Sequence, residues 1–196
     1  LISNGLIHDI VSESGAVTAD REIDAGGRYV MPGIIDAHLH SVYADRIDTL
    51  SKAAATGGIT TLIPYVGAVK AWGQGGDLVD SVKSFIEEGE SSSILDFGIH
   101  CTFTQNDMAA VETSIPALIK MGVVSFKGFT AYKKRGMKLE DEELLKIMGL
   151  IARLHLEGNT IIMVTHDQEL SRRAARRIYL LDGRVIDVET ENVPPL

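Results

Sequence analysis

The sequence predicts an α/β fold in which parallel strands alternate with helices. Short β-type runs recur between residues 34 and 165, and segments with helical spacing separate them. Glycines follow two of the helical segments, at positions 57–58 and 122, where a left-handed residue can end a helix at little cost. Five such βα units are compatible with an open doubly wound sheet and with part of an eight-fold barrel. Periodicity alone does not choose between these two architectures.

The expected strands follow one another along the chain. Residues 23–32 predict short strands around a glycine turn, and hence a small β segment at the start of the chain. The five β-type runs cover residues 33–40, 59–66, 94–103, 123–129 and 160–165. Two further runs within 178–188 are joined across Asp182-Gly183, which predicts a β-hairpin. We therefore divide the chain into a short β segment (1–32), a set of βα units (33–155) and a C-terminal tail (156–196).

The expected helices have apolar stripes and recognisable ends. One stripe runs through Leu78, Val82, Phe85 and Ile86, and another through Leu144, Met148, Ile151 and Ala152. Asp107 is expected to cap the helix that follows the third β-type run. The acidic residues 140–143 complement the positive end of the next helix dipole.

Composition excludes several classes of function. The chain has 196 residues, 45% hydrophobic and 23% charged, so it can bury a core. A net charge of -8 disfavours nucleic acid as a partner, and the single cysteine, Cys101, excludes an internal disulfide and a CxxC zinc site. No apolar run approaches the roughly 20 residues that span a bilayer, and residues 1–9 lack the layout of a secretory signal. We expect a cytoplasmic protein without nucleic-acid partners or a membrane span.

A first candidate site ends the first predicted strand, in the run Asp36-Ala37-His38-Leu39-His40. Residues two apart point to the same face of a strand, so His38 and His40 can share one metal ion. Active sites of α/β proteins form at this end of parallel strands. Asp36 would then accept a hydrogen bond from a ligating imidazole. The alternative is a pair of ordinary polar residues at the end of a strand.

A second candidate is Lys127, at the end of the fourth predicted strand between Phe126 and Phe129. Apolar neighbours should desolvate its amine, which favours the neutral form. A neutral amine can react with carbon dioxide to give a carbamate, a carboxylate that can bridge two divalent ions. The alternative is a surface or salt-bridged lysine. His100, beside Cys101, is more typical of a core or strand-end histidine than of a metal ligand.

Three motifs occur in order along the chain. They are Gly27-Arg28-Tyr29-Val30-Met31-Pro32-Gly33-Ile34-Ile35-Asp36-Ala37-His38-Leu39-His40, then Ala55-Thr56-Gly57-Gly58-Ile59-Thr60-Thr61, then Phe126-Lys127-Gly128-Phe129-Thr130-Ala131-Tyr132. With them, residues 4–154 resemble the dihydropyrimidinase and hydantoinase branch of the amidohydrolase superfamily. The resemblance implies a partial (β/α)8 barrel of the amidohydrolase type, with a two-metal site.

The same resemblance implies roles for individual residues. His38 and His40 match the family's first metal ligands, and Lys127 matches its carboxylated lysine. Tyr132 matches the tyrosine that stabilises the developing oxyanion. The implied cofactors are one or two divalent ions, zinc above all, and carbon dioxide bound as the lysine carbamate. The implied substrate is a small cyclic amide or imide, such as a dihydropyrimidine, a hydantoin or allantoin, which a hydroxide attacks so that a ring C–N bond is hydrolysed.

The tail carries a different pattern, with Val164-Thr165-His166-Asp167 followed at a distance by Asp182-Gly183-Arg184. On these elements residues 156–189 resemble the C-terminal end of an ABC transporter ATPase, in which the histidine matching His166 senses the nucleotide γ-phosphate. The chain has no Gly-x-x-x-x-Gly-Lys-Ser/Thr loop, so we do not expect this part to hydrolyse ATP. The sequence is thus interpreted as a fusion with its seam between residues 152 and 158.

Three functional interpretations remain open. One is a metal-dependent hydrolase of cyclic amides that is incomplete, because nothing after Glu169 matches the family's later histidine and catalytic aspartate; His166 would then follow the fifth strand as a third metal-binding histidine. The second is a nucleotide-binding fragment related to transporter ATPases, and the third is a non-catalytic chimera of two α/β folds. The exposed sheet edges of a partial barrel also predict a homo-oligomer.

Overall fold

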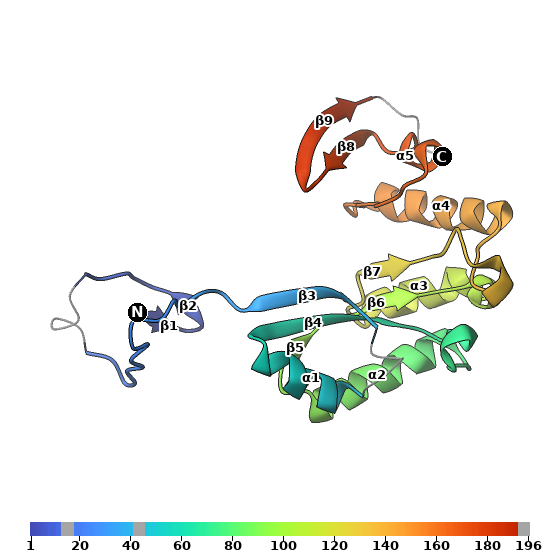
Figure 1. Ribbon diagram of the computed structural model, residues 1–196. Coiled ribbons are helices and arrows are strands. Elements are labelled where there is room, and N and C mark those ends of the chain that lie inside the picture. Colours follow the sequence, from blue (N-terminus) through green and yellow to red (C-terminus); the bar gives the residue numbers. More distant parts are fainter. Residues whose placement is uncertain (13–17, 41–45, 192–196) are drawn as a thin grey trace. The chain divides into compact units, whose positions relative to one another are not determined.

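The computed structural model describes residues 1–12, 18–40 and 46–191 (Figure 1). Within it the chain forms two compact units, Leu1–Gly33 and Ile34–Leu196. The boundary that we predicted at residues 155–156 lies inside the second unit and stays a prediction.

The first unit contains one very short hairpin. Strands β1 (Ile2–Ser3) and β2 (Leu6–Ile7) pair in antiparallel fashion. The turn residues Asn4 and Gly5 both have positive φ, 52° and 76°, as a two-residue hairpin turn requires. The strands predicted at residues 23–32 are wrong, since this segment forms a turn but no strand. Its side chains are exposed and have no partner strand, and β propensity does not form a strand without one.

Parallel strands form the sheet of the second unit (Figure 1). The strands are β3 (Ile34–Leu39), β4 (Ile59–Val66), β5 (Asp96–Phe97), β6 (His100–Thr102) and β7 (Ser125–Lys127). Their order is β3-β4-β6-β7, and β5 also pairs with β4. Each helical crossover therefore returns the chain beside the strand just completed. A curled, partial barrel has this sequential strand order. An open doubly wound sheet does not require it.

Helices lie between the strands at the expected places. They are α1 (Ile47–Thr56), α2 (Leu78–Ser92), α3 (Val111–Lys120), α4 (Asp141–Leu156) and α5 (Gln168–Ser171), with 3₁₀ turns η3 (Lys70–Trp72), η4 (Gln105–Asp107) and η5 (Lys133–Arg135). Gly58 and Gly122 follow α1 and α3 with φ of 81° and 92°, as predicted. No helix within the described ranges is long and apolar enough to cross a membrane.

The helix ends follow capping chemistry with one difference from expectation. Glu140 and Glu143 form a capping box at the start of α4. Asp107 does not cap α3 directly, because it closes a capping box with Thr104 around η4, and α3 begins only at Val111. The Asp107 carboxylate therefore caps the 3₁₀ turn η4, whereas the sequence pattern assigned it to the helix α3.

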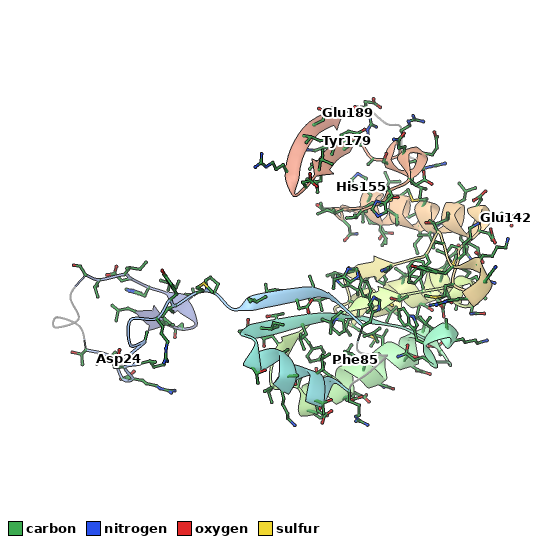
Figure 2. All side chains as sticks on the ribbon, viewed as in Figure 1. Asp24, Phe85, Glu142, His155, Tyr179 and Glu189 are labelled. Carbon is green, nitrogen blue, oxygen red and sulfur yellow. The ribbon has the colours of Figure 1, made fainter. Side chains whose placement is uncertain are left out.

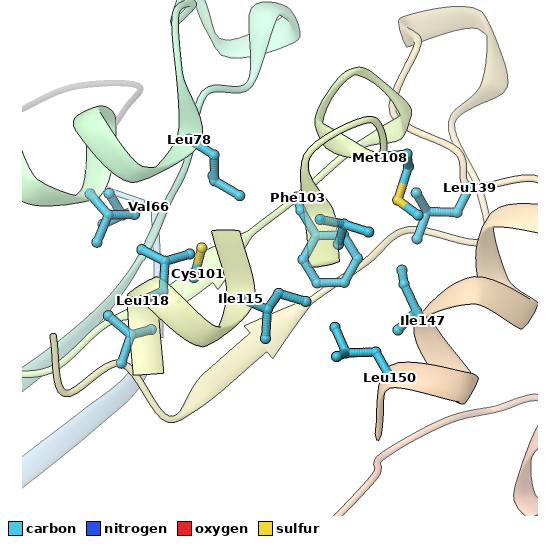
Figure 3. Packing of buried hydrophobic residues seen from close by; sticks show 13 residues of the cluster. Val66, Leu78, Cys101, Phe103, Met108, Ile115, Leu118, Leu139, Ile147 and Leu150 are labelled. Atoms are coloured by element: carbon cyan, nitrogen blue, oxygen red, sulfur yellow. The ribbon is translucent and has the colours of Figure 1, made fainter. Parts of the chain in front are cut away.

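The main hydrophobic core packs the sheet against helices α2, α3 and α4 (Figure 3). Val66 of β4 and Cys101 of β6 point into this core, and Cys101 is fully buried. Because side chains alternate along a strand, the preceding residues, Tyr65 and His100, face the other side of the sheet. The core thus fixes which face of the sheet carries the polar group described below.

The fifth strand predicted at residues 160–165 is wrong. This segment has no strand pairing, and Ile162 and Val164 are 87% and 92% exposed. The run has strong β propensity, but β formation depends on a partner strand and a surface to cover. In the described part of the chain the segment pairs with no strand, so the parallel sheet ends at β7.

The C-terminal hairpin forms as predicted. Strands β8 (Arg176–Leu181) and β9 (Arg184–Thr190) pair in antiparallel fashion across Asp182 and Gly183. The Arg177 guanidinium lies 2.7 Å from a carboxylate oxygen of Glu189, which also accepts from the Tyr179 hydroxyl at 3.1 Å (Figure 2). These bonds tie the two strands together at the end away from the turn.

Candidate functional site

A row of side chains crosses the sheet on the face opposite the main core. Strand register places Tyr65 of β4 opposite His100 of β6, and His100 opposite Ser125 of β7. Residues in register on parallel strands share a face, and Lys127, two residues after Ser125, shares it too. This row lies at the carboxyl ends of β4 and β7, where active sites of parallel sheets form.

His38 and His40 meet at the end of β3, as the sequence predicted. Their ring centroids are 5.7 Å apart with the planes at 67°. The His38 ring lies edge-on to Tyr65 at 4.8 Å, and its Nδ1 is 3.3 Å from the Tyr65 hydroxyl. His40 stacks on Tyr65 at 4.8 Å and meets Trp72 edge-on at 5.4 Å. Both histidines therefore lie against one aromatic ring.

Lys127 reaches the same ring from the far strand. Its Nζ lies 4.2 Å from the centroid of Tyr65 and 5.1 Å from that of Phe129. Burial of the amine lowers the pKa of Lys127 below its ordinary value. The same desolvation, with smaller contributions from Lys127 and His38, lowers the pKa of His40. The group thus favours neutral forms of an imidazole and an amine, which are the forms that bind metal or carbon dioxide.

The separation of the two histidine rings is compatible with a shared metal ion, but the two residues supply only two donors. Two imidazoles on one tetrahedral zinc put their ring centroids about 5 Å apart, close to the 5.7 Å between His38 and His40. Across the described ranges, no group of three or more His, Cys, Asp or Glu residues is arranged to hold a metal ion. A third protein donor at this place would have to be Lys127 after carboxylation, or a residue from elsewhere.

His100 links three strands beneath the Tyr65 ring. It stacks on Tyr65 with centroids 4.9 Å apart. Its Nδ1 lies 2.5 Å from Ser125 Oγ on β7, and its Nε2 lies 2.9 Å from the carbonyl oxygen of Ala37 on β3. The side chain thus spans from β6 to β3 across β4, which requires the sheet to curl.

The remaining predicted residues lie at varying distances from this group. Asp36 accepts a hydrogen bond from the backbone amide of His38 at 3.1 Å, and its predicted bond to a ligating imidazole stays a prediction. Tyr132 is 57% exposed in a left-handed conformation and meets Phe129 edge-on at 5.8 Å. Phe129 is therefore the contact that connects Tyr132 to Lys127.

His166 is not brought to this group by a strand. It lies in the extended segment before α5 and its side chain is exposed. The neighbouring Asp167 caps α5 by accepting from the amides of Glu169 and Leu170. Its proposed part in metal binding, which depended on a fifth strand at 160–165, has lost that structural support.

Sequence reasoning missed Tyr65 as a site residue and interpreted His100 as a core or strand-end histidine. The available signal for Tyr65 was its place at the end of the second predicted strand, level with the end of the first. The signal for His100 was its alternation with buried Cys101, which puts the histidine on the opposite face. Both residues become recognisable only once the register between strands is known.

Comparison with known proteins shows relatives of one kind, although no protein-family model matches the chain. A D-hydantoinase of Streptomyces coelicolor is 30% identical over 171 residues, covering 80% of this chain and 35% of the relative. A D-hydantoinase of Ralstonia pickettii is 30% identical over 203 residues, covering 97% of this chain and 43% of the relative. The solved structure of an L-hydantoinase (dihydropyrimidinase) from Arthrobacter aurescens superposes with a TM-score of 0.58 at 28% identity, covering 74% of this chain and 32% of that one.

These similarities establish homology with hydantoinases and dihydropyrimidinases over much of the chain. The chain spans well under half the length of the curated relatives that it matches. An alignment over 97% of 196 residues takes in about 190 of them, so most of the tail at 156–196 aligns with a hydantoinase as well. The parallel sheet is consistent with part of the barrel of such an enzyme.

Proposed function

We propose that this chain is part of a metal-dependent hydrolase that opens cyclic amides or imides at a ring C–N bond, as in hydantoins and dihydropyrimidines. The observation that carries the proposal is the convergence of His38, His40 and Lys127 on one ring, that of Tyr65, at the carboxyl ends of three parallel strands. Homology with hydantoinases over most of the chain supports the same reaction class. Because this chain covers only part of its relatives' length, the activity of a whole relative is a proposal for it.

His38, His40 and Lys127 would be the metal ligands. His38 and His40 would hold a divalent ion, zinc in our proposal, through neutral imidazole nitrogens. Lys127, carboxylated by carbon dioxide, would add an anionic oxygen donor, and its lowered pKa supports that reaction because only the neutral amine attacks carbon dioxide. When bound, the metal supplies a hydroxide at neutral pH and polarises the scissile carbonyl.

Tyr132 and Asp36 would have supporting roles, one toward the substrate and one toward the backbone of His38. We propose that the Tyr132 hydroxyl donates to the substrate oxygen as negative charge develops there. Its exposure leaves that hydroxyl accessible to a small molecule. Asp36 accepts the hydrogen bond from the His38 amide described above, and so holds the backbone that carries the first imidazole. His166 would act as a further ligand only if the segment before α5 folded against this group.

Metal content tests the proposal directly. Protein grown with added zinc and separated by size exclusion is expected to carry about one or two ions per chain by elemental mass spectrometry. His38→Ala and Lys127→Ala are each expected to lose that metal. His155→Ala is the matched control, because His155 is an exposed histidine at the end of α4 whose side chain bonds to the carbonyl of Asn159 (Figure 2). Hydantoin and dihydrouracil hydrolysis would then be assayed on the metal-loaded chain.

Two outcomes would reject the proposal. Wild-type protein without bound metal would leave the motifs as ancestry alone, in a chain that folds without catalysing anything. Metal that stays bound in His38→Ala and Lys127→Ala, but is lost in His155→Ala, would place the ion elsewhere.

Self-association is a separate proposal about the same chain. Ile35, in the edge strand β3, and Val124, just before the other edge strand β7, are 61% and 84% exposed, and an unpaired strand edge invites pairing with a second copy. We propose a homo-oligomer formed through these exposed edges. Light scattering behind size exclusion should give a mass above 21.2 kDa at every concentration tested. A constant monomer mass would reject it.

A second, narrower proposal concerns the tail, and it rests on the resemblance of residues 156–189 to transporter ATPases. We propose at most nucleotide binding without hydrolysis for this segment, because the chain has no phosphate-cradling loop. A fluorescent ATP analogue that fails to bind would leave the tail as a structural appendage of a fused or diverged chain.

A further inference from the structure

His100 makes contacts that the proposed reaction does not explain. Its two ring nitrogens bond to different strands, and its face stacks on Tyr65. We propose that His100 is a positioning residue that holds the end of β3, with His38, at a fixed place relative to the end of β7, with Lys127. We call this link between the two strand ends the clamp. The effect of the clamp on metal binding rests on the proposed function, while the clamp itself rests only on the contacts of the chain.

The hydrogen bonds define which nitrogen carries the proton. A backbone carbonyl only accepts, so Nε2 of His100 donates to the oxygen of Ala37 at 2.9 Å. In the neutral imidazole the other nitrogen, Nδ1, then accepts, so the Ser125 hydroxyl donates to it at 2.5 Å. The contacts therefore select the Nε2–H tautomer and engage both nitrogens at once.

The two anchoring points lie next to the proposed ligands. Ala37 immediately precedes His38, and its carbonyl is part of the peptide unit that joins the two residues. Ser125 precedes Lys127 by two residues on the same face of β7. Strands β3 and β7 are not neighbours in the sheet, because β4 and β6 lie between them. The His100 side chain is thus a direct link between two strand ends that backbone hydrogen bonds connect only through intermediates.

The stack above His100 extends this link to the metal-binding face. His100 supports one ring, Tyr65, that also contacts His38, His40 and the Lys127 amine. Small errors in ligand placement weaken metal binding, and residues that orient ligands commonly change affinity by about 10–100-fold when replaced. We expect an effect of this size at His100, although it touches no proposed ligand itself.

The first test uses metal-free protein. Long-range ¹H–¹⁵N spectra distinguish the two neutral tautomers of a histidine ring, and the His100 signals are assigned by their loss in His100→Gln. A single Nε2–H tautomer is expected. An Nδ1–H tautomer, or a ring that exchanges between both, would overturn the clamp whatever the metal chemistry.

The second test measures zinc affinity by competition with a chelator, together with thermal unfolding of the metal-free chain. His100→Phe keeps an aromatic ring against Tyr65 but loses both hydrogen bonds, and is expected to weaken zinc binding at least about 10-fold. His100→Gln can still donate to Ala37, so it should recover most of that loss, and Ser125→Ala, which removes only the Nδ1 partner, should fall between. The order of affinities should not follow the order of unfolding temperatures.

The outcomes separate the two proposals. Wild-type affinity in His100→Phe would overturn the positioning role while leaving the proposed function intact. Equal losses of zinc affinity in His100→Gln and His100→Phe that follow the unfolding temperatures would also overturn it. They would show that His100 has a purely structural role. Wild-type protein that binds no zinc would reject the proposed function, and the tautomer measurement would then decide the clamp alone.

Discussion

Tyr65 is the residue on which the geometry of the strand ends depends. It is 8% exposed, and three imidazoles and one amine lie against its ring. Its hydroxyl lies 3.3 Å from Nδ1 of His38. The ring and the hydroxyl therefore contribute differently, the ring through packing and the hydroxyl through a single long hydrogen bond.

Two substitutions at Tyr65 separate these contributions. Tyr65→Ala is expected to lower the free energy of unfolding by about 3–5 kcal/mol, because deleting a buried aromatic ring leaves a cavity. Tyr65→Phe keeps the ring and should cost about 1 kcal/mol or less, the usual net value of one hydrogen bond. Urea unfolding followed by circular dichroism measures both. Equal losses would mean that the hydroxyl, not the ring, holds this group together.

The Lys127 amine gives a prediction about pH. Only the unprotonated amine reacts with an acylating reagent, and burial lowers the pKa of Lys127, so the reactive form persists to lower pH. In competitive labelling with trace acetic anhydride, we expect half-maximal reactivity of Lys127 below about pH 10.4, the ordinary value for lysine. Peptide mass spectrometry measures it, with the exposed Lys83 of α2 as the internal comparison. A midpoint at or above the ordinary value would contradict desolvation of this amine.

Local sequence predicted part of this group and not the rest. His38 and His40 follow from spacing within one strand, and Lys127 from its apolar neighbours. Tyr65 and His100 are 35 positions apart and meet only through the β4–β6 register, which no local pattern specifies. Asp36 accepts from the backbone amide of His38, a contact that the sequence pattern did not specify, and its role toward an imidazole stays a prediction.

At the scale of elements, the segment at residues 160–165 shows the limit of propensity. It has the β-branched run of a strand, and the preceding helix α4 ends where a crossover should end. The adjacent edge strand, β7, has only three residues, and the apolar side chains of the segment remain exposed. Elements whose partners are present, such as β8 and β9, form where the sequence predicts them.

This difference predicts the cost of charged substitutions in the segment. Ile162→Lys and Val164→Lys change side chains that are 87% and 92% exposed, so each should alter the free energy of unfolding by no more than about 0.5 kcal/mol. Leu118→Lys, at a fully buried position of α3, is the contrasting control and should prevent folding or cost several-fold more. Chemical denaturation measures all three. A loss above about 1 kcal/mol at either exposed position would show that the segment packs as a strand in solution.

At the scale of the whole molecule, the sequence predicted the alternation of strands and helices but could not choose between sheet and barrel. The choice depends on strand order, and the order β3-β4-β6-β7 arises from short crossovers that return each strand beside the last. The curl is visible at one residue, because His100 reaches the carbonyl of Ala37 across an intervening strand. Such a contact joins residues 63 positions apart and lies beyond any periodic pattern.

Cys101 offers a probe that connects this core with the metal proposal. It is the only cysteine in the chain and is fully buried between the sheet and the helices. Burial, with a smaller contribution from Asp107, raises the pKa of its thiol to about 12. The thiolate is the reactive form, so a thiol reagent near neutral pH should modify Cys101 only when the core opens. The rate of modification then reports the free energy of that opening.

A ligand that binds only the folded chain must slow this reaction. At a free zinc concentration about 100 times the dissociation constant, linkage adds about 2.7 kcal/mol to folding, so Cys101 labelling should slow by roughly 100-fold. His38→Ala should lose the protection, whereas His155→Ala, outside the strand-end group, should keep it. Zinc that binds the thiolate of the opened chain would slow labelling equally in all three proteins. Protection that is unchanged in His38→Ala would therefore mean that metal does not stabilise the fold through β3, and that the sheet and its polar face are energetically independent.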